Sequence, residues 1–208
     1  MTGIIHMTGN KSLPLWLMAG IAAAALANAQ TAPPQTHGDS MKQGGAMKMA
    51  AADSPASFVS AAGLAGMTEV ALGKAALKKS EDPAIQEFAQ RMVRDHGNAN
   101  EKLAAIAKRK ALSFPTSLDS EHKSAVQQVT AKSGAEFEAA YAQQMVEDHD
   151  KAVALFESAS KMSDTDLSGF ASKTLPTLKE HKEMADRLQA GKRSASTTSS
   201  SVQHPKQY

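Results

Sequence analysis

Four long stretches of the chain place apolar residues at steps of three and four, and this spacing limits the fold more than any other feature. Such steps keep side chains on one face of an α-helix, and that face must turn inward to be buried. No window alternates apolar and polar residues convincingly, so the pattern requires no strands. The sequence therefore predicts an all-α protein. The stripes are Phe58, Ala62, Ala65, Glu69, Leu72, Ala76; Ile85, Phe88, Met92, His96, Ala99, Leu103, Ile106; Phe137, Tyr141, Met145, His149, Ala152, Phe156, Ala159; and Leu167, Phe170, Thr174, Leu178, His181, Ala185, Leu188.

Helix start signals divide these stripes into separate elements. A capping residue before a proline, or a Ser followed three residues later by an acidic residue, is typical of a helix N-terminus. We expect helices at about 56–79, 83–110, 135–161 and 165–190, as two αα-hairpins within a domain spanning 54–191, with a short extra helix near 118–131 between them. The signals are Asp53-Ser54-Pro55, Asp82-Pro83, Ser133-x-x-Glu136, and Ser163-x-x-Asp166 with Asp164.

Residues 1–29 are typical of a secretory signal sequence. Lys11 is their only charge, residues 13–27 are apolar or small, and Ala27-Asn28-Ala29 is a cleavage site before Gln30. The apolar run of about 15 residues is short for the ~30 Å hydrocarbon core of a membrane, although an uncleaved anchor remains an alternative. We therefore expect export to the periplasm, with no membrane-spanning segment after cleavage.

Two segments flank the expected bundle without helical periodicity. Residues 30–53 are rich in Met, Gly and Pro and predict a disordered linker, and the Ser/Thr-rich residues 192–208 predict a disordered tail. Thioethers and imidazole together suit Cu(I), but composition alone explains such side chains in a linker, and this explanation is favoured. The side chains concerned are His37, Met41, Met47 and Met49.

Composition excludes several classes of protein. The chain has no cysteine, which excludes a disulfide scaffold, a zinc ribbon, a thiolate enzyme and an iron–sulfur protein. The net charge of +2 and the lack of a patch combining aromatic and basic residues argue against nucleic-acid binding. The sequence contains no recognisable nucleophile triad, glycine-rich phosphate loop or pair of hydrolase carboxylates. A binding or structural protein is therefore favoured over an enzyme.

The polar members of the stripes are few and lie at similar heights. Glu69, His96 and His149 are each the one ionisable or strongly polar residue of their stripe, and Thr174 alone accompanies His181. At 1.5 Å per residue, the two members of each hairpin lie within ~3–5 Å of each other along the bundle axis. The sequence therefore predicts one interior polar layer, whether the connection between the hairpins is short or a long crossover.

Two of these histidines end an internal repeat. Phe88-Ala-Gln-Arg-Met-Val-Arg-Asp-His96 aligns with Tyr141-Ala-Gln-Gln-Met-Val-Glu-Asp-His149, with six of nine positions identical. A duplication that reuses one packing solution explains this match. The repeat is equally compatible with two halves that each deliver an Asp-His pair to a common interior.

A layer of three histidines and one glutamate has two interpretations. As an N₃O ligand set, the four residues would suit a single Zn, Cu or Fe ion. Asp95 and Asp148 point roughly 100° away from the stripes and would serve neighbouring histidines as outer-shell acceptors. Without metal, the layer would be a hydrogen-bonded network that fixes helix register, because buried polar groups need partners. Both interpretations remain open at this stage.

The combined motifs resemble domain-of-unknown-function family 4142. The resemblance rests on the signal sequence, Glu69, the Met-Val-x-Asp-His repeat and Leu175-Pro176-x-Leu-x-x-His181, and it covers residues 57–189. It implies a ferritin-like helical bundle in an exported bacterial protein, of a kind often labelled an outer membrane protein, and it implies no activity. We expect either a metal-binding envelope protein, or a non-catalytic envelope or stress-related interaction protein with a metal-free layer.

A di-iron centre is not expected, although ferritin-like folds often hold one. Di-iron bundles use Glu-x-x-His on two helices and Glu on the other two. Here the residue three positions before each of the three histidines is apolar. These residues are Val93, Val146 and Leu178.

Overall fold

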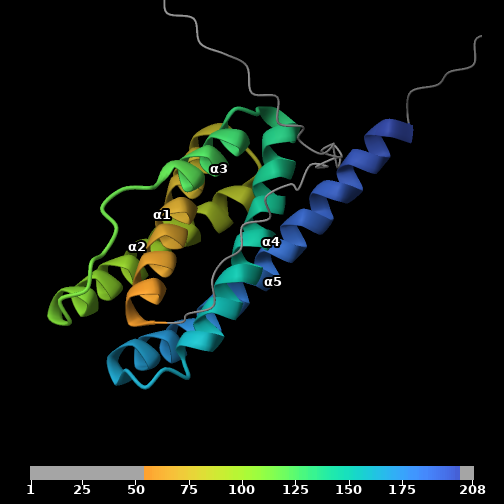
Figure 1. The fold of residues 1–208 in the computed structure, drawn as a ribbon. Helices are drawn as coiled ribbons and strands as arrows, with labels where there is room; N and C mark the ends of the chain where they lie inside the picture. Colours follow the sequence, from red (N-terminus) through yellow and green to blue (C-terminus); the bar gives the residue numbers. More distant parts are fainter. Residues whose placement is uncertain (1–53, 202–208) are drawn as a thin grey trace, which may run out of the picture. The chain divides into compact units, whose positions relative to one another are not determined.

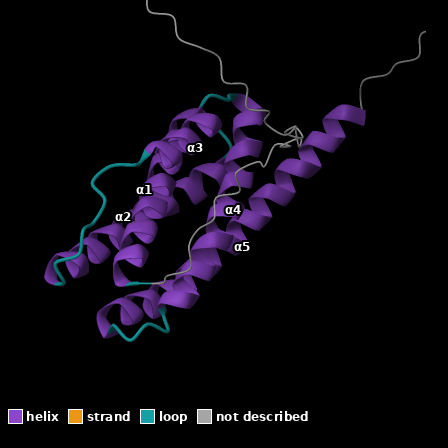
Figure 2. Cartoon of the chain, viewed as in Figure 1, coloured by secondary structure: helices purple, strands orange, loops and turns teal. Residues whose placement is uncertain are grey.

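The computed structural model describes residues 54–201, and the side chains of residues 54–194. Five helices and no strand occupy this range, which confirms the predicted all-α class (Figures 1 and 2). The predicted signal sequence, the linker 30–53 and residues 202–208 lie outside the described residues. The helices are α1 (Pro55–Lys79), α2 (Pro83–Arg109), α3 (Ser120–Thr130), α4 (Gly134–Ala159) and α5 (Thr165–Ser201).

The first two helices begin at the predicted capping residues. Ser54 caps α1 in a capping box with Ser57, in which each side chain bonds to the backbone N–H of the other residue. The Asp82 carboxylate accepts hydrogen bonds from two backbone N–H groups at the start of α2. These caps satisfy donors that have no partner inside a helix, so they fix where each helix starts.

The starts of α4 and α5 differ from the prediction. The predicted capping box of Ser133 and Glu136 does not form, since the Ser133 side chain makes no capping hydrogen bond within the described range. Gly134 has a positive φ of 53°, and this left-handed turn carries the chain into α4 without help from the serine. At the start of α5, the Asp164 carboxylate takes the capping role instead of Ser163 and accepts two backbone N–H bonds.

Helix α5 is longer than predicted. The sequence predicts an end near 190 and a disordered tail from 192, but the helix continues to Ser201. The Lys192 ammonium group bonds to the carboxylates of Asp82 and Glu138, and the Ser194 hydroxyl donates to the Ala190 carbonyl at 3.1 Å. Because lengthening an existing helix requires no new nucleus, the weak helix propensity of Ser and Thr does not stop it.

The bundle consists of two hairpins joined by a long crossover. Helix α1 pairs with α2, and α4 pairs with α5. Helix α2 ends beside the cluster that holds Phe58, whereas α4 begins in the cluster that holds Leu72. The chain must therefore return along the bundle between them, as Figure 1 shows. This is the single-crossover connection of ferritin-like bundles, which the sequence alone left undecided.

Close packing of α1 against its neighbours explains its small residues. A Cβ atom at Gly63 would lie 2.8 Å from Pro115 of the crossover, and one at Gly66 would lie 2.5 Å from the Asn100 side chain on α2. By length and composition alone α1 could cross a membrane, but half of the apolar window is buried inside the bundle. The low polarity of α1 therefore matches its position as a core helix.

The core consists of two apolar clusters at opposite ends of the bundle. One contains Phe58 and Phe156, and the other contains Phe88 and Tyr141. Phe88 is 1% exposed and Phe156 is 6% exposed, so both belong to the core as their stripes predict.

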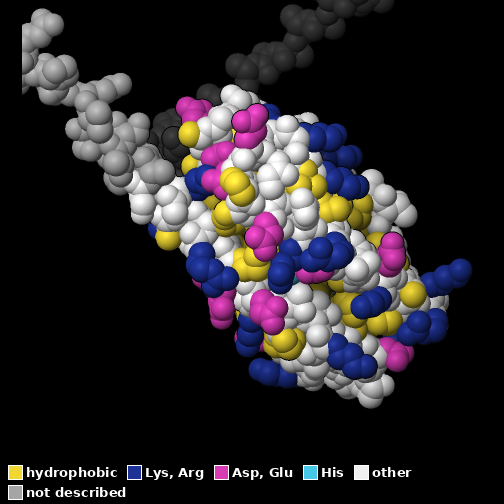
Figure 3. All heavy atoms as spheres, turned by 180° about the vertical axis from the view of Figure 1, so that it is seen from behind, with side chains coloured by type: hydrophobic (Ala, Val, Ile, Leu, Met, Phe, Trp, Pro, Cys, Tyr) yellow, Lys and Arg dark blue, Asp and Glu magenta, His cyan; other side chains and the backbone are white. Residues whose placement is uncertain are grey.

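On the face in Figure 3, Lys and Arg side chains alternate with Asp and Glu, without a large patch of one sign.

Candidate metal centre

Four buried side chains form a polar layer between the two apolar clusters. Helix α1 supplies Glu69, α2 supplies His96, α4 supplies His149 and α5 supplies His181, and none is more than 6% exposed. The ring centroids of each histidine pair are 5.3 to 5.5 Å apart. The structure therefore brings together all four residues that the apolar stripes singled out.

Each imidazole ring is held through one of its two nitrogens. A hydrogen bond of this kind fixes the ring orientation and directs the lone pair to the opposite nitrogen, as second-shell acceptors do in metal sites. The acceptors come from three different helices. The contacts run from His96 Nδ1 to Glu69 Oε2 (2.8 Å), from His149 Nδ1 to the Met145 carbonyl oxygen (2.8 Å), and from His181 Nε2 to Asp95 Oδ2 (3.0 Å).

The opposite nitrogen of each ring is buried and has no hydrogen-bond partner among the described residues. These atoms are His96 Nε2, His149 Nε2 and His181 Nδ1. One nitrogen from each ring lies within 4.8 Å of one nitrogen from each of the others. We assign the unpartnered nitrogens as this convergent set, because the other three are already held by oxygen.

Glu69 lies behind His96 in this arrangement. Its Oε2 accepts the bond from His96, and its Oε1 is 3.5 Å from His149 Nδ1. Among the described residues, the group whose ligand atoms converge consists of the three histidines without Glu69. The structure therefore gives Glu69 the position of an acceptor for a ligand, where the sequence predicted a fourth ligand.

The two aspartates predicted as outer-shell acceptors have different surroundings. Asp95 accepts from His181 and so occupies the predicted position. Asp148 accepts from the Gln144 side chain at 2.9 Å, and its Oδ2 is buried without a partner among the described residues. Burial and the nearby charge of Glu69 raise the pKa of Asp148 to about 7. Asp148 therefore accepts from Gln144, and no histidine bonds to it among the described residues.

Glu69 and His96 favour their charged forms although both are buried. Burial opposes the ionisation of Glu69, but its interactions with His96 and His149 outweigh this effect and lower its pKa to about 2. Burial also acts against the charged form of His96, yet the charge and hydrogen bond of Glu69 raise its pKa. Together they place a negative charge on Glu69 and favour the protonated form of His96 in the absence of metal.

The other two histidines favour their neutral forms. Burial lowers the pKa of His149. Burial and the neighbouring charges of His96 and His149 lower the pKa of His181 to about 4. A neutral imidazole keeps a lone pair, which is the form that binds a metal ion. Two ligands are therefore ready to bind near neutral pH, and the third requires loss of one proton.

Two features of the site were missed from the sequence. Tyr141 was placed in the core, and its hydroxyl is buried without a partner among the described residues; burial and the charge of Glu69 raise its pKa. The Met145 carbonyl holds His149 from one turn earlier on the same helix. Met145 lies four residues before His149, which is the spacing that brings a backbone carbonyl near a helical side chain. Because every residue inside a helix has such a neighbour, this spacing could not single out Met145 in advance.

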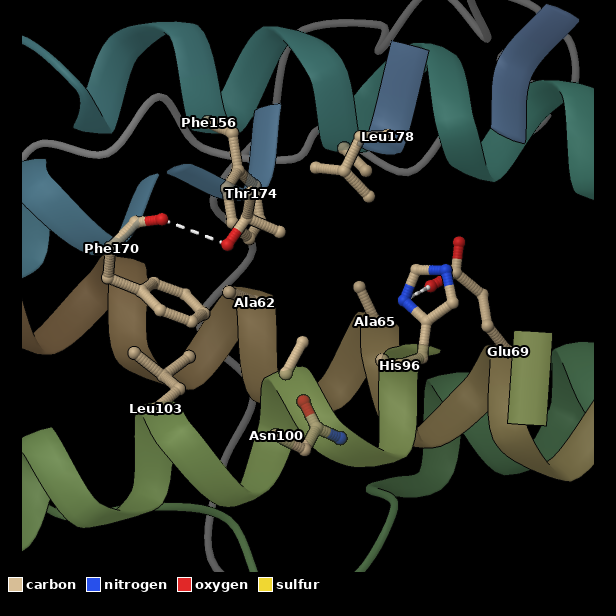
Figure 4. A pocket seen from close by; sticks show the side chains of 13 residues that line it. Ala62, Ala65, Glu69, His96, Asn100, Leu103, Phe156, Phe170, Thr174 and Leu178 are labelled. Carbon is tan, nitrogen blue, oxygen red and sulfur yellow. Dashed lines mark hydrogen bonds and ion pairs between the residues drawn. The ribbon is translucent and has the colours of Figure 1, made fainter. Parts of the chain in front are cut away.

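A small cavity, whose empty space of about 330 Å³ includes open solvent, reaches the layer from the cluster that holds Phe58. His96 and Glu69 form part of its wall, and Figure 4 shows their hydrogen bond beside Ala65 and Leu178. The remaining wall is mostly apolar, with Asn100 and Thr174 as its neutral polar members. The cavity gives the polar layer one side on which a small molecule has room.

Comparisons with known proteins identify a family and a fold. A family model described as "Domain of unknown function (DUF4142)" matches residues 40–188. The crystal structure of a DUF305 fragment from Deinococcus radiodurans superimposes with a TM-score of 0.56 and 14% sequence identity, covering 65% of this chain and 95% of the fragment. At this identity the likeness supports the helical fold alone. No curated protein matches the chain significantly.

Proposed function

The chain belongs to the DUF4142 family, a domain of unknown function, and from its own residues we propose that it is an exported protein that binds one transition-metal ion between His96, His149 and His181. Two observations carry the proposal: one nitrogen of each buried ring lies within 4.8 Å of one nitrogen of each of the others, and each ring has one nitrogen without a partner among the described residues. The opposite nitrogen of each ring is held by an oxygen acceptor, so all three rings are oriented for one shared ligand.

The cost of an empty layer supports a bound ion. A buried polar atom that loses its hydrogen bond costs roughly 1–3 kcal/mol, and each of the three rings has one such nitrogen among the described residues. A single cation would bind all three lone pairs at once. The ionised Glu69 behind His96 would offset part of the positive charge and strengthen that ligand.

The three ring nitrogens must move slightly closer together to bind one metal ion. At metal–nitrogen distances of ~2.0–2.1 Å, tetrahedral geometry places two ligand nitrogens ~3.3 Å apart. The three nitrogens lie within 4.8 Å of one another. Small rotations of the rings would close this difference, and the acceptors Glu69 and Asp95 are themselves flexible side chains.

The donor set narrows the choice of metal. Imidazole nitrogens suit Zn, Cu and Fe, whereas Mg and Ca prefer oxygen. Three protein ligands leave a fourth position for water or another molecule, as in catalytic zinc sites. The proposal is therefore a mononuclear Zn, Cu or Fe centre with an open position, without an assigned reaction.

Metal content and stability together test this proposal. Untagged protein purified from the native compartment should contain about one metal ion per chain by elemental analysis. Adding Zn²⁺ or Cu²⁺ to metal-free protein, to 100 times the Kd, should stabilise the fold by ~2.7 kcal/mol. The gain should shrink in acid, because ligands must lose their protons to bind.

Two histidine variants give the matched comparison. His149→Ala should abolish the metal-dependent stabilisation. His122→Ala should retain it, since His122 lies outside the layer and pairs with Asp119 at 2.7 Å. A metal content near zero, with no shift in melting temperature for any first-row metal, would contradict metal binding.

A metal-free polar layer is the second candidate, in a non-catalytic envelope or stress-related interaction protein. The two carboxylate–imidazole pairs, Glu69 with His96 and Asp95 with His181, favour it because they already give two rings a partner. In this case chelators should change nothing, and each His→Ala substitution should cost ~1–3 kcal/mol through the partner left unpaired.

Export is part of the proposal and has its own test. Residues 1–29 support it through their composition and the Ala27-Asn28-Ala29 site. Intact-mass measurement of a periplasmic fraction should find Gln30 at the N-terminus, as glutamine or pyroglutamate. Full-length chain in the inner membrane would favour the uncleaved anchor instead.

A further inference from the structure

We propose that the cavity beside His96 admits a small uncharged molecule, of the size of a diatomic gas, to the open position of the three-histidine metal centre. This inference rests on the proposed function, because it names the class of ligand that reaches the same site. It follows from the walls of the cavity, from the groups at its inner end, and from its partial exposure.

The cavity wall offers almost nothing to a charged ligand. Nine of the thirteen lining residues are apolar or glycine, among them Ala62, Leu103 and Phe156. An ion that entered would have to give up water without gaining new partners, which costs several kcal/mol or more. A small neutral molecule pays little for the same transfer.

The neutral polar residues of the wall already have partners. The Thr174 hydroxyl donates to the Phe170 carbonyl at 2.9 Å, which Figure 4 marks with a dashed line. The Asn100 amide donates to the Gly63 carbonyl at 3.4 Å. The Thr174 hydroxyl proton and one Asn100 N–H are therefore already engaged, which leaves few polar groups on the wall to replace the water of an entering ion.

The inner end of the cavity holds its two ionisable side chains. These are His96, which is 6% exposed with Nε2 unpartnered among the described residues, and Glu69, which is 1% exposed and bonded to His96. His96 is at the same time a ligand of the proposed centre, so a neutral molecule in the cavity lies beside the metal.

The cavity is not sealed from solvent. Four of its lining residues are only partly buried. Five of the thirteen lining residues are Ala or Gly. Ala99 lies one turn from His96 on α2, and a larger side chain there would fill the cavity close to the centre. The partly buried lining residues are Ala65, Ala99, Asn100 and Thr174.

Nitric oxide and azide are suitable probes, because they are similar in size and differ in charge. The full protein is loaded with Fe²⁺ without oxygen, and binding of each probe is followed by stopped-flow absorbance and electron paramagnetic resonance. Because Fe²⁺ itself reacts more readily with nitric oxide than with azide, each rate is divided by the rate for the same probe with Fe²⁺ in imidazole solution. We expect this normalised rate to be at least tenfold higher for nitric oxide than for azide. Equal normalised rates would overturn the selectivity for uncharged molecules.

Variants of the wall test the route itself. Ala99→Leu should slow nitric oxide binding at least tenfold without changing the iron stoichiometry. Ala104→Leu is the matched control, since Ala104 is partly buried on the same helix but does not line the cavity. Leu178→Ala enlarges the cavity and should speed binding several-fold, which tests the route even where Ala99→Leu does not fold.

The possible failures are distinguishable. If the unmodified protein binds no iron, zinc or copper, the proposed function fails and the inference falls with it. If iron binds in the expected ratio but neither Ala99→Leu nor Leu178→Ala changes the rate for nitric oxide, the metal centre stands and the cavity is not its route.

Discussion

The two repeated segments, Phe88–His96 on α2 and Tyr141–His149 on α4, share a sequence but not an environment. Both helices run in the same direction and lie diagonally across the bundle, since α2 packs on α1 and α5, and α4 packs on the same two helices. An approximate two-fold rotation about the bundle axis therefore exchanges α2 with α4 and α1 with α5.

That rotation places Glu69 of α1 in the position of His181 of α5. Asp95 on α2 consequently faces an imidazole and bonds to it at 3.0 Å. Asp148 on α4 instead feels the charge of Glu69, which together with burial raises its pKa to about 7. Two identical Asp-His pairs thus differ in chemistry because one residue on the opposite helix differs. The broken symmetry keeps Glu69 ionised beside His96 and favours the protonated form of Asp148 near them.

The largest expected effect tests whether the two segments are equivalent as core. Phe88 is 1% exposed and Tyr141 is fully buried, and their rings meet edge to face with centroids 6.2 Å apart. Phe88→Ala and Tyr141→Ala should each lower the free energy of unfolding by ~3–5 kcal/mol, as loss of a buried aromatic ring does. Urea unfolding of both variants measures this. A loss below ~1 kcal/mol at either site would contradict the equivalence.

The second prediction uses the pH dependence of the free energy of unfolding, in metal-free protein, to distinguish the two repeated segments. The pKa of His181 falls from 6.5 to about 4 on folding, so its contribution is present above pH 6.5 and is lost as the pH falls. The pKa of Asp148 rises from 3.8 to about 7, so its contribution grows as the pH falls below 7. Between pH 6.5 and 4.5 the two oppose each other, each by about 2 kcal/mol.

Single variants should reveal the pH dependence of stability that the two groups cancel in the unmodified protein. Asp148→Asn should lose stability as the pH falls from 6.5 to 4.5, because the His181 contribution is no longer offset. His181→Gln should instead gain stability over the same interval. Chemical unfolding at several pH values measures both. Parallel curves for the two variants would show that the halves do not differ in protonation.

The third prediction compares the two aspartates directly at pH 7. Asp95→Ala removes the acceptor of a buried imidazole and should cost ~1–3 kcal/mol. Asp148→Ala removes a carboxyl group whose inner oxygen has no partner among the described residues and whose other oxygen accepts from Gln144 at 2.9 Å, and it should cost less than Asp95→Ala, about 0.5–1 kcal/mol. Urea unfolding measures both losses. Equal losses would mean that His181 facing Asp95, and Glu69 facing Asp148, do not make the two aspartates different.

The smallest effect concerns the one ring hydroxyl that distinguishes the segments. Tyr141→Phe makes the two segments alike at this position and removes a buried oxygen that lacks a partner within residues 54–201. The variant should be neutral or more stable by up to ~1 kcal/mol, because no hydrogen bond is lost. Thermal unfolding checks this. A loss above 1 kcal/mol would indicate a partner for the hydroxyl.

Helical periodicity was sufficient to predict the layer but not its internal contacts. Glu69, His96, His149 and His181 interrupt stripes that must be buried, so their meeting follows from spacing alone. Whether an aspartate next to a histidine bonds to another ring depends on which residue lies on the facing helix. Asp95 accepts from a histidine and Asp148 from Gln144, a difference that the sequence did not reveal because the repeat hides the difference between Glu69 and His181.

The helix ends were harder for a similar reason. Asp82 and Ser54 act through neighbours in the chain, so their capping roles could be predicted. The extension of α5 depends on Lys192 reaching Asp82 and Glu138, which are distant in sequence. The crossover likewise depends on where hairpins dock, and two hairpins with short turns are compatible with either connection.

The long crossover also has a consequence for the order of folding. Each hairpin is built from contacts that are local in sequence, and such contacts form early, whereas docking of the hairpins closes a longer loop. The Glu69–His96 pair lies within the first hairpin, but the three-histidine cluster exists only after the second hairpin has docked. A metal ion held there would stabilise contacts made late, so it should slow unfolding far more than it accelerates folding.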